Sequence, residues 1–549
     1  MPTNAEVMAK TLAERGVEYV FGLPGGEIVA FIDACRRAGI RFLLTGHESS
    51  AAWMAQVLGQ ITGIPGVCAT TLGPGATNLV TGIANAFLDR APVVAVTAQI
   101  PKRAMPTMTH QRLALDALFA PITKASMAVG EEDTAGLILR AMDLAIAPRP
   151  GPVHVLLASD LAIEEAPSKP CRADPARVTT PIDPIAQRLN AAQRPLVLIG
   201  LGATPHDAPA IRALIDRLQA PFLVTPKVKG IASEDHPMFL GVASGMAIDR
   251  DILETIRAAD LVLAIGFDPV ECDKTWFAGT PIVSIDSASM AEGDYRPLEA
   301  IGNIAVLVSQ LQIDSKPWPP DLLAQRRAAM GGGPPGSPPI PGSAFSSHHQ
   351  RDQGIARGPG GPPPIAASGI SPLRMIEELR AVFPRDGIVT CDVGSHKLVM
   401  GQFWRSYEPG TFFMSNGLSG MGFGIPAAIA AQLAHPEGAV MAVVGDGGML
   451  MMLHDLVLIR ELGLPIVIVV FTDRSLSLIR VSESRRGVEP YGVDFCPPDF
   501  AAAAQSFGIG AQKCATIPEA RDAVERALAG RAPFLVDVPI DHREYYDLV

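Results

Sequence analysis

Short apolar runs alternate with longer helical patterns along most of the 549-residue chain, and this alternation constrains the fold more than any other feature. Helical patterns such as residues 48–62 and 76–88 separate the runs. Continuous apolar strands joined by helices predict parallel sheets covered on both faces, so we expect an α/β fold with doubly wound sheets. The expected strands are residues 40–45, 67–72, 93–99, 153–158, 195–200, 221–225, 261–266, 281–286, 388–393, 439–445, 465–472 and 533–538.

The pattern occurs three times, so we expect three α/β domains of about 130–180 residues each. They are an N-terminal domain at residues 1–165, a central domain at 183–313 and a C-terminal domain at 370–549. Between the last two, residues 330–365 are about half Gly or Pro. Such a segment buries too little surface to offset its ordering entropy, so we expect a disordered or extended linker without chemistry of its own.

The composition excludes several classes of protein. With 48% hydrophobic residues the chain can form a large core, and its net charge of -11 disfavours a broad nucleic-acid surface. The seven cysteines form no CxxC pair, which disfavours a disulfide framework or a zinc site. The chain starts with Thr3 and Glu6 spaced as a capping box, and it shows neither a signal peptide nor a membrane span. We therefore expect a cytoplasmic protein that binds neither nucleic acid nor membranes.

Residues 439–475 carry the strongest chemical signal. A strand ends just before Gly445-Asp446-Gly447-Gly448, and after a helix a second strand ends just before Asp473. Both aspartates then lie at the carboxyl ends of parallel strands, where open α/β sheets bind ligands. The glycines let the backbone approach a phosphate closely, and carboxylates beside a diphosphate suit Mg²⁺. A tight turn without a ligand would explain the glycines alone, but not the second aspartate.

This segment resembles the thiamine diphosphate motif, which begins with Gly-Asp-Gly and ends a little under thirty residues later in Asn-Asn or Asn-Asp. Here it ends in Thr472-Asp473, so the first Asn is replaced while the second position keeps an oxygen ligand. The resemblance implies thiamine diphosphate and Mg²⁺ as cofactors. It also implies Asp446, Asp473 and the backbone oxygen of Ser475 as the metal ligands.

Glu48 follows His47 and opens a helix of small residues. An acid in the first turn of a helix is favoured by the helix dipole alone, so Glu48 has an ordinary explanation. The segment also resembles the HE(Q/S)xAAxxA stretch of thiamine diphosphate enzymes. There the Glu hydrogen-bonds N1′ of the aminopyrimidine and thereby promotes deprotonation of C2, so the resemblance implies a catalytic role for Glu48.

Residues 72–82, LGPGATNLVTG, resemble the same region of acetolactate synthases almost position by position. The resemblance implies that Gly73 and Asn78 contact the cofactor. The next conserved place of that family corresponds to Thr109-His110-Gln111 and lines its reaction pocket. His110 and Gln111 are therefore candidates for protonating or orienting the substrate, although His110 is equally explained as a loop imidazole.

The third domain adds further matches. Residues 392–396, DVGSH, resemble a loop whose histidine, here His396, lies near the diphosphate. Residues 415–424 resemble the segment that supports the cofactor, with Met421 at the place of the apolar side chain that wedges between its two rings. Ser419 stands where Gly is usual, and its backbone oxygen would accept from the 4′-amino group. The implied cofactor contacts are Gly73, Asn78, His396, Ser419, Met421, Gly445, Gly447, Gly448, Asp473 and Ser475.

The resemblance covers nearly the whole chain except the linker, and its subgroup is the acetolactate synthases. Residues 266–271, GFDPVE, look like a stretch of the catabolic, flavin-independent members. Gly200-Leu201-Gly202 lacks the third glycine of a dinucleotide fingerprint, so bound FAD is possible but less expected than its absence. The family's Trp after the last cofactor strand is missing from residues 478–483. Arg480 and Lys229 are alternatives for pairing with the carboxylate of a second substrate, and each is equally explained as a surface charge.

The expected function is the thiamine diphosphate- and Mg²⁺-dependent decarboxylation of a 2-keto acid, pyruvate being the first candidate, followed by carboligation to a second carbonyl. One alternative is a non-ligating decarboxylase or an acyl transferase on the same scaffold. Another is a non-catalytic or regulatory homologue that binds the cofactor. In this family Glu48 and the metal site come from different subunits, so the resemblance implies a homodimer or homotetramer.

Overall fold

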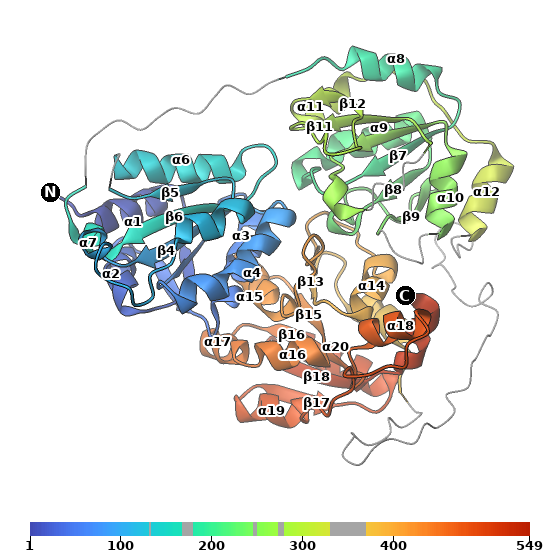
Figure 1. The fold of residues 1–549 in the computed structure, drawn as a ribbon. Helices are drawn as coiled ribbons and strands as arrows, with labels where there is room; N and C mark the ends of the chain where they lie inside the picture. The colour runs from blue at the N-terminus through green and yellow to red at the C-terminus, as the bar shows by residue number, and fades with distance from the viewer. Residues whose placement is uncertain (131–132, 167–178, 245–249, 273–278, 330–368) are drawn as a thin grey trace.

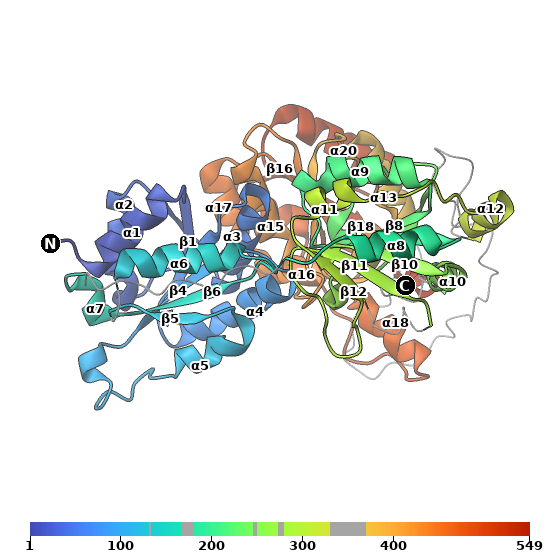
Figure 2. The same ribbon diagram turned by 90° about the horizontal axis from the view of Figure 1, so that it is seen from above.

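The computed structural model describes residues 1–130, 133–166, 179–244, 250–272, 279–329 and 369–549. The expected linker at 330–365 lies outside the described residues. The chain forms three six-stranded sheets, each covered by helices on both faces (Figures 1 and 2), which confirms the expected α/β class.

The first sheet has the strand order β2-β1-β3-β4-β6-β5, and all its pairs are parallel. Its strands are β1 Tyr19–Leu23, β2 Arg41–Leu44, β3 Gly66–Thr70, β4 Val93–Gln99, β5 Ser126–Ala128 and β6 Val153–Ala158. Its helices are α1 Asn4–Glu14, α2 Val29–Arg37, α3 Glu48–Thr62, α4 Pro74–Leu88, α5 Leu115–Phe119, α6 Thr134–Ile146 and α7 Ser159–Ile163. The capping box of Thr3 and Glu6 at the start of α1 is confirmed.

The third sheet has the order β14-β13-β15-β16-β18-β17, which repeats the connectivity of the first sheet strand for strand. Its strands are β13 Ile388–Cys391, β14 Phe412–Met414, β15 Val440–Gly445, β16 Ile466–Thr472, β17 Gly510–Lys513 and β18 Phe534–Pro539. Its helices are α13 Pro372–Val382, α14 Ser395–Phe403, α15 Gly424–Ala434, α16 Asp446–Met452, α17 Asp455–Leu462, α18 Ser477–Arg485, α19 Phe500–Ser506, α20 Ile517–Gly530 and α21 Tyr545–Leu548.

The central sheet has the order β12-β11-β10-β7-β8-β9, the doubly wound order of dinucleotide-binding folds. Its strands are β7 Pro195–Ile199, β8 Phe222–Val224, β9 Phe239–Val242, β10 Leu261–Ile265, β11 Ile282–Asp286 and β12 Leu298–Ile301. Its helices are α8 Asp183–Ala191, α9 Ala208–Leu218, α10 Arg250–Ala258, α11 Ile304–Gln310 and α12 Pro320–Ala329. The chain changes direction across the sheet between β7 and β10.

All twelve expected strands form, each within two residues of its expected ends. The first and third sheets share one buried apolar cluster, which runs through α3 and α15. Small residues bring the helices of this layer close together: a Cβ at Gly82 on α4 would lie 2.4 Å from that of Ala52 on α3. The first and third sheets are therefore packed as one body, with α3, α4 and α15 between them (Figure 1).

Candidate active site

Glu48 is the first residue of α3, and His47 caps this helix by accepting a hydrogen bond from the Ser49 N–H at Nδ1, 3.1 Å away. The Glu48 side chain is buried. Its Oε2 accepts a hydrogen bond from Asn78 Nδ2 on α4 at 3.0 Å. A Cβ at Gly75 would lie 3.3 Å from Glu48 Oε1, so the Gly-Pro-Gly turn passes close to this carboxylate. The fold thus brings Glu48 together with Asn78.

Gln111 lies against the same turn, whereas His110 does not. Gly73 has a φ of +59°, and a Cβ there would be 3.1 Å from Gln111 Cβ. Gln111 itself has a positive φ of 54°, and both it and His110 are exposed. Among the described residues His110 makes no hydrogen bond or ion pair, so its expected role has no contact in support.

Asp446 and Asp473 lie at the ends of neighbouring strands, since β15 pairs with β16 and Gly445 is opposite Phe471. Asp446 accepts hydrogen bonds from the backbone N–H of Gly447 at 2.8 Å and of Arg474 at 2.7 Å. Asp473 accepts from the Ser475 N–H at 3.1 Å and from Ser477 Oγ at 2.7 Å. These hydrogen bonds hold both carboxylates at the carboxyl ends of β15 and β16.

Burial dominates the electrostatics of this pair. It raises the pKa of Asp446, and the neighbouring Asp473 charge raises it further. Burial likewise raises the pKa of Asp473, against the hydrogen bonds from Ser477 and Ser475. Two buried carboxylates that repel each other form an arrangement that a cation would stabilise.

Asp392 was not among the expected site residues, yet it organises the site. Its buried carboxylate accepts from the N–H groups of Val393 at 2.7 Å, Gly422 at 2.8 Å and Phe423 at 3.2 Å. A Cβ at Gly448 would lie 2.0 Å from Asp392 Oδ2, so only glycine fits there. The expected strand at 388–393 included Asp392, whereas β13 ends at Cys391, so the shorter strand places this aspartate at its carboxyl end.

His396 lies beside the glycines of the turn that carries Asp446, since a Cβ at Gly445 would be 2.9 Å from His396 Cε1. Burial lowers the pKa of His396 to about 4, so the ring is neutral near pH 7. Its Nε2 is buried without a hydrogen-bond partner among the described residues, and so is the Ser475 Oγ. Unpaired buried polar atoms beside a glycine turn mark a place for a bound group, and the Ser475 hydroxyl could donate to a diphosphate there.

Ser419 and Met421 lie between β14 and α15. Ser419 has a φ of +55°, and its Oγ accepts a hydrogen bond from Lys397 Nζ at 2.9 Å. Met421 reaches the glycine turn, because a Cβ at Gly447 would be 3.2 Å from Met421 Cε. The expected cofactor residues of the third domain therefore lie near the carboxyl ends of the strands of the third sheet. Their oxygen atoms and hydrogen-bond donors fit a Mg²⁺–diphosphate group.

The described residues hold no cluster of three or more His, Cys, Asp or Glu side chains able to bind a metal ion. A cation between Asp446 and Asp473 would need further oxygens, from the backbone of Ser475 and from a phosphate. This matches the ligand set that the sequence resemblance implies.

The two expected partners for a second carboxylate are both engaged elsewhere. Lys229 is fully buried and pairs with Glu234, its Nζ 3.2 Å from Glu234 Oε2. Arg480 makes a two-pronged ion pair with Asp494, at 2.6 and 2.8 Å. Lys229 therefore belongs to a buried ion pair with Glu234, and the Arg480 guanidinium already holds the Asp494 carboxylate.

The glycine turn after β7 occupies the direction change of the central sheet, where a dinucleotide would bind. Its backbone donors are already paired: the Leu201 N–H with Glu271 Oε2 at 2.8 Å, and the Gly202 N–H with the Gly266 oxygen at 2.7 Å. Burial raises the pKa of Glu271 to about 8 and that of Asp286 to about 7. A turn with paired donors and carboxyl groups does not fit a dinucleotide diphosphate at this place.

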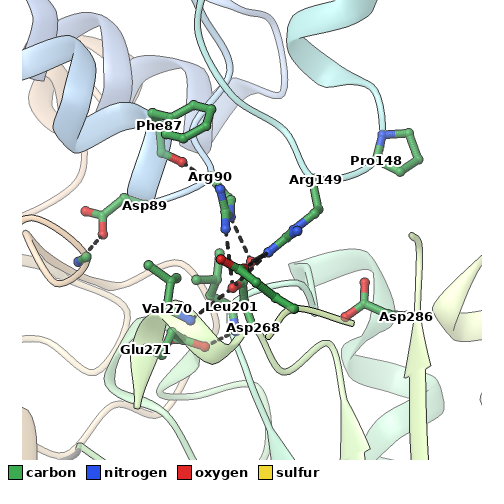
Figure 3. Close-up of polar contacts among 12 residues, drawn as sticks. Phe87, Asp89, Arg90, Pro148, Arg149, Leu201, Asp268, Val270, Glu271 and Asp286 are labelled. Carbon is green, nitrogen blue, oxygen red and sulfur yellow. Dashed lines mark hydrogen bonds and ion pairs between the residues drawn. The ribbon is translucent and has the colours of Figure 1, made fainter. Parts of the chain in front are cut away.

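Arg90 and Arg149 of the first domain point at Asp268 of the central domain (Figure 3). Arg90 Nε lies 2.7 Å from Asp268 Oδ2, and Arg149 lies 3.3 Å from the same oxygen. Burial alone would raise the pKa of Asp268, but the Arg90 hydrogen bond and the two positive charges hold it below its ordinary value. These pairs anchor the central domain to the first.

Each of the three domains matches a family profile. The first matches "Thiamine pyrophosphate enzyme, N-terminal TPP binding domain" over residues 2–118. The second matches the central domain of the same enzymes over residues 182–311, and the third their C-terminal TPP binding domain over residues 392–538. Thiamine pyrophosphate is another name for thiamine diphosphate.

Whole-chain relatives agree with the profiles. An "Acetolactate synthase" of Bacillus subtilis (strain 168) is 32% identical, covering 99% of this chain and 94% of its own length. A "Probable acetolactate synthase large subunit" of Methanocaldococcus jannaschii is 30% identical over 100% of this chain and 93% of its own length. An "Acetolactate synthase, catabolic" of Raoultella terrigena is 29% identical over 98% and 95%. In the described part of the chain, no helix combines the length and apolarity needed to cross a membrane.

Proposed function

Because the chain belongs to the thiamine diphosphate enzymes of the acetolactate synthase type, we propose that it decarboxylates pyruvate with the help of Mg²⁺ and joins the remaining two-carbon unit to a second 2-keto acid. The observation that carries this proposal is the buried pair of Asp446 and Asp473 at adjacent strand ends. Bound thiamine diphosphate would supply a nucleophilic carbon and an electron sink, which decarboxylation of a 2-keto acid requires.

In this proposal residues 370–549 hold the diphosphate and metal. Asp446, Asp473 and the backbone oxygen of Ser475 would ligate Mg²⁺ and thereby fix the diphosphate. The neutral His396 would lie beside the diphosphate, with its Nε2 buried and without a partner among the described residues. The remaining contacts would come from Ser419, Met421, Gly445, Gly447 and Gly448.

Residues 1–165 would supply the pyrimidine side. The Glu48 carboxyl group would hold a proton toward N1′ of the aminopyrimidine, and Asn78 would orient it through the hydrogen bond to Oε2. Gly73 would line the same side, and Gln111, which lies against Gly73, would contact the substrate. The central domain at 183–313 carries no chemistry in this proposal.

We also propose a homodimer or homotetramer whose sites lie between chains. Within one chain, the hydrogen bonds of the Glu48 side chain stay inside the first domain, where Asn78 is its donor. The relatives from Methanocaldococcus jannaschii and from Escherichia coli (isozyme 2) carry the term large subunit in their names, which supports assembly.

The deciding experiment incubates purified protein with pyruvate, Mg²⁺ and thiamine diphosphate and measures acetolactate and acetaldehyde separately. Acetolactate as the main product is expected. Acetaldehyde as the main product would favour the decarboxylase alternative, and neither product despite bound cofactor would favour a non-catalytic homologue. Omitting Mg²⁺ is the matched control, since the two carboxylates then lack their cation.

A further inference from the structure

Residues 415–421 form the segment between β14 and α15, which we call the support segment. Its first half is held from outside the third domain: Asp89, at the end of α4, accepts from the backbone N–H groups of Asn416 at 3.3 Å and Gly417 at 2.8 Å. Asp89 itself pairs with Lys227 of the central domain at 3.1 Å. All three domains therefore meet at the start of this segment.

The second half of the support segment contains a strained residue. Ser419 has a φ of +55°, a left-handed conformation that is costly for residues with a Cβ. Its hydroxyl is fixed from two sides, because it accepts from Lys397 Nζ at 2.9 Å and donates to the Asn416 oxygen at 3.1 Å. The strain at Ser419 is thus offset by hydrogen bonds that glycine would not make.

Lys397 depends on this contact in turn. It lies in the first turn of α14, directly after His396, and its side chain is buried. Burial lowers the pKa of Lys397 to about 8, while the negative charge of Asp89 opposes that shift. Among the described residues its ammonium group makes one hydrogen bond, to Ser419 Oγ. A buried ammonium group keeps a conformation only when it is hydrogen-bonded, so the two side chains lock each other.

We propose that Lys397 is a positioning residue which, through Ser419, holds the second half of the support segment so that the Ser419 carbonyl and Met421 face the cofactor. The inference rests on the proposed function, because it takes that segment as the cofactor's support. The link runs from α14, beside His396, to the segment that carries Ser419 and Met421. One hydrogen bond thereby ties the two ends of the cofactor site together.

The test uses four variants of the full-length protein: Lys397→Met, Ser419→Ala, Ser419→Gly and the double variant Lys397→Met with Ser419→Gly. Binding of thiamine diphosphate with Mg²⁺ is measured by calorimetry, and the near-ultraviolet circular dichroism of the bound cofactor reports its conformation. Lys397→Met and Ser419→Ala should each weaken binding about 10–100-fold, the usual effect of losing a group that orients a binding residue, and alter the dichroism.

Glycine at 419 separates positioning from direct contact. Because glycine adopts the left-handed backbone without strain, the double variant should bind the cofactor more tightly than Lys397→Met alone. If the double variant binds as weakly as Lys397→Met, Lys397 acts on the cofactor itself and the proposal is wrong. Wild-type affinity and dichroism in Lys397→Met would equally overturn it.

Lys229→Met is the matched control, since it removes another buried ammonium group, one that pairs with Glu234 and, among the described residues, makes no hydrogen bond to the support segment. It should lower the melting temperature while leaving the cofactor dichroism unchanged. If the wild-type protein fails to bind thiamine diphosphate, the proposed function fails. If the wild type binds it and the four variants do not follow the expected order, only the positioning role fails.

Discussion

Asp446 and Asp473 show how single residues set the chemistry of the site. Both are buried, and backbone N–H groups of Gly447, Arg474 and Ser475 donate to them. Hydrogen bonds of this kind place a carboxylate but leave most of its charge in a poorly solvated environment. A metal ion bound there, as we propose, would explain why two acids that destabilise each other are kept together.

We expect Asp446→Asn to abolish Mg²⁺-dependent binding of thiamine diphosphate without unfolding the protein. The amide oxygen still accepts from the Arg474 N–H, and one of two repelling buried charges is removed, so the melting temperature should stay the same or rise. Calorimetric titration and thermal unfolding measure both effects. Binding as tight as in the wild type would show that the metal lies elsewhere.

Glu48→Gln should leave cofactor binding nearly intact but slow exchange of the C2 proton by about two orders of magnitude or more. The glutamine oxygen still accepts from Asn78 Nδ2, so the geometry is preserved while the proton-carrying group is lost. Hydrogen–deuterium exchange at C2, followed by NMR, tests this directly. Unchanged exchange would leave Glu48 as a helix-start acid without a catalytic role.

Glu271 gives a pH dependence that is independent of the active site. Burial raises its pKa to about 8, against an ordinary value of 4.5. Between these values the folded state binds more protons than the unfolded state, so the free energy of unfolding falls as pH rises and the loss is complete above about pH 8. Glu271→Gln should therefore raise the melting temperature at pH 9 more than at pH 5.

The physical reason is that glutamine keeps an oxygen for the Leu201 N–H but carries no charge to desolvate. The gain at pH 9 should be on the order of a few kcal/mol. Glu437→Gln is the control, because the Glu437 side chain is 94% exposed. A stabilisation of Glu271→Gln that does not change with pH would contradict the burial of a protonated carboxyl group.

At the scale of elements, the first and third sheets place different chemistry at the same topological positions. Glu48 follows β2, the second strand of its sheet, and the support segment follows β14, the second strand of the other. The Gly-Pro-Gly turn follows β3, and the Gly-Asp-Gly turn follows β15 in the corresponding place. In the proposed function, the loops at the carboxyl ends of equivalent strands would supply complementary halves of a cofactor site.

The sequence predicted twelve of the strands because these are apolar runs, most of them buried in sheet interiors. Five of the six it missed, β5, β9, β12, β14 and β17, lie at sheet edges and have only three or four residues. Edge strands are short and partly exposed, so their pattern is weak. The sixth, β1, is interior, but its Gly22 weakens the strand signal.

The site residues also divide into those that the local sequence pattern predicts and those that it does not. Asp446, Asp473 and Glu48 could be predicted because each begins a turn or helix just after an apolar run. Asp392 was recognised only as part of a motif, because its role depends on N–H groups thirty residues away, at Gly422 and Phe423. The pairing of Arg480 with Asp494 could not be predicted, since nothing in their spacing of fourteen residues brings them together.

That ion pair changes what Arg480 is expected to do. It joins α18 to the segment around Asp494. Both lie after β16, the strand that ends just before Asp473. We expect Arg480→Ala and Asp494→Ala to weaken cofactor binding by similar factors and to leave the ratio of acetolactate to acetaldehyde unchanged. Product analysis with both variants tests this. A ratio shifted toward acetaldehyde in Arg480→Ala alone would show that the guanidinium holds the second substrate.

At the scale of the whole molecule, one chain packs its first and third domains together through α3 and α15, and the central domain is tied on by Arg90, Arg149 and Asp268. Inside this body, Glu48 finds its hydrogen-bond donor in Asn78, and the hydrogen bonds of the Asp446 and Asp473 side chains stay within the third domain. If each site is formed by two chains, Glu48 can be substituted in one chain and Asp446 in the other.

Mixing Glu48→Gln with Asp446→Asn tests this arrangement. Each variant alone should be inactive, because every site of its homodimer carries the same defect. In a mixed dimer one site combines both defects and the other has none. Random exchange makes half of the dimers mixed with one intact site each, so activity should return to about a quarter of the wild-type value.

Light scattering would establish that dimers are present before mixing and after it. If Glu48 and Asp446 served the same site within a single chain, no mixture would contain an intact site, and activity would stay at the level of the separate variants.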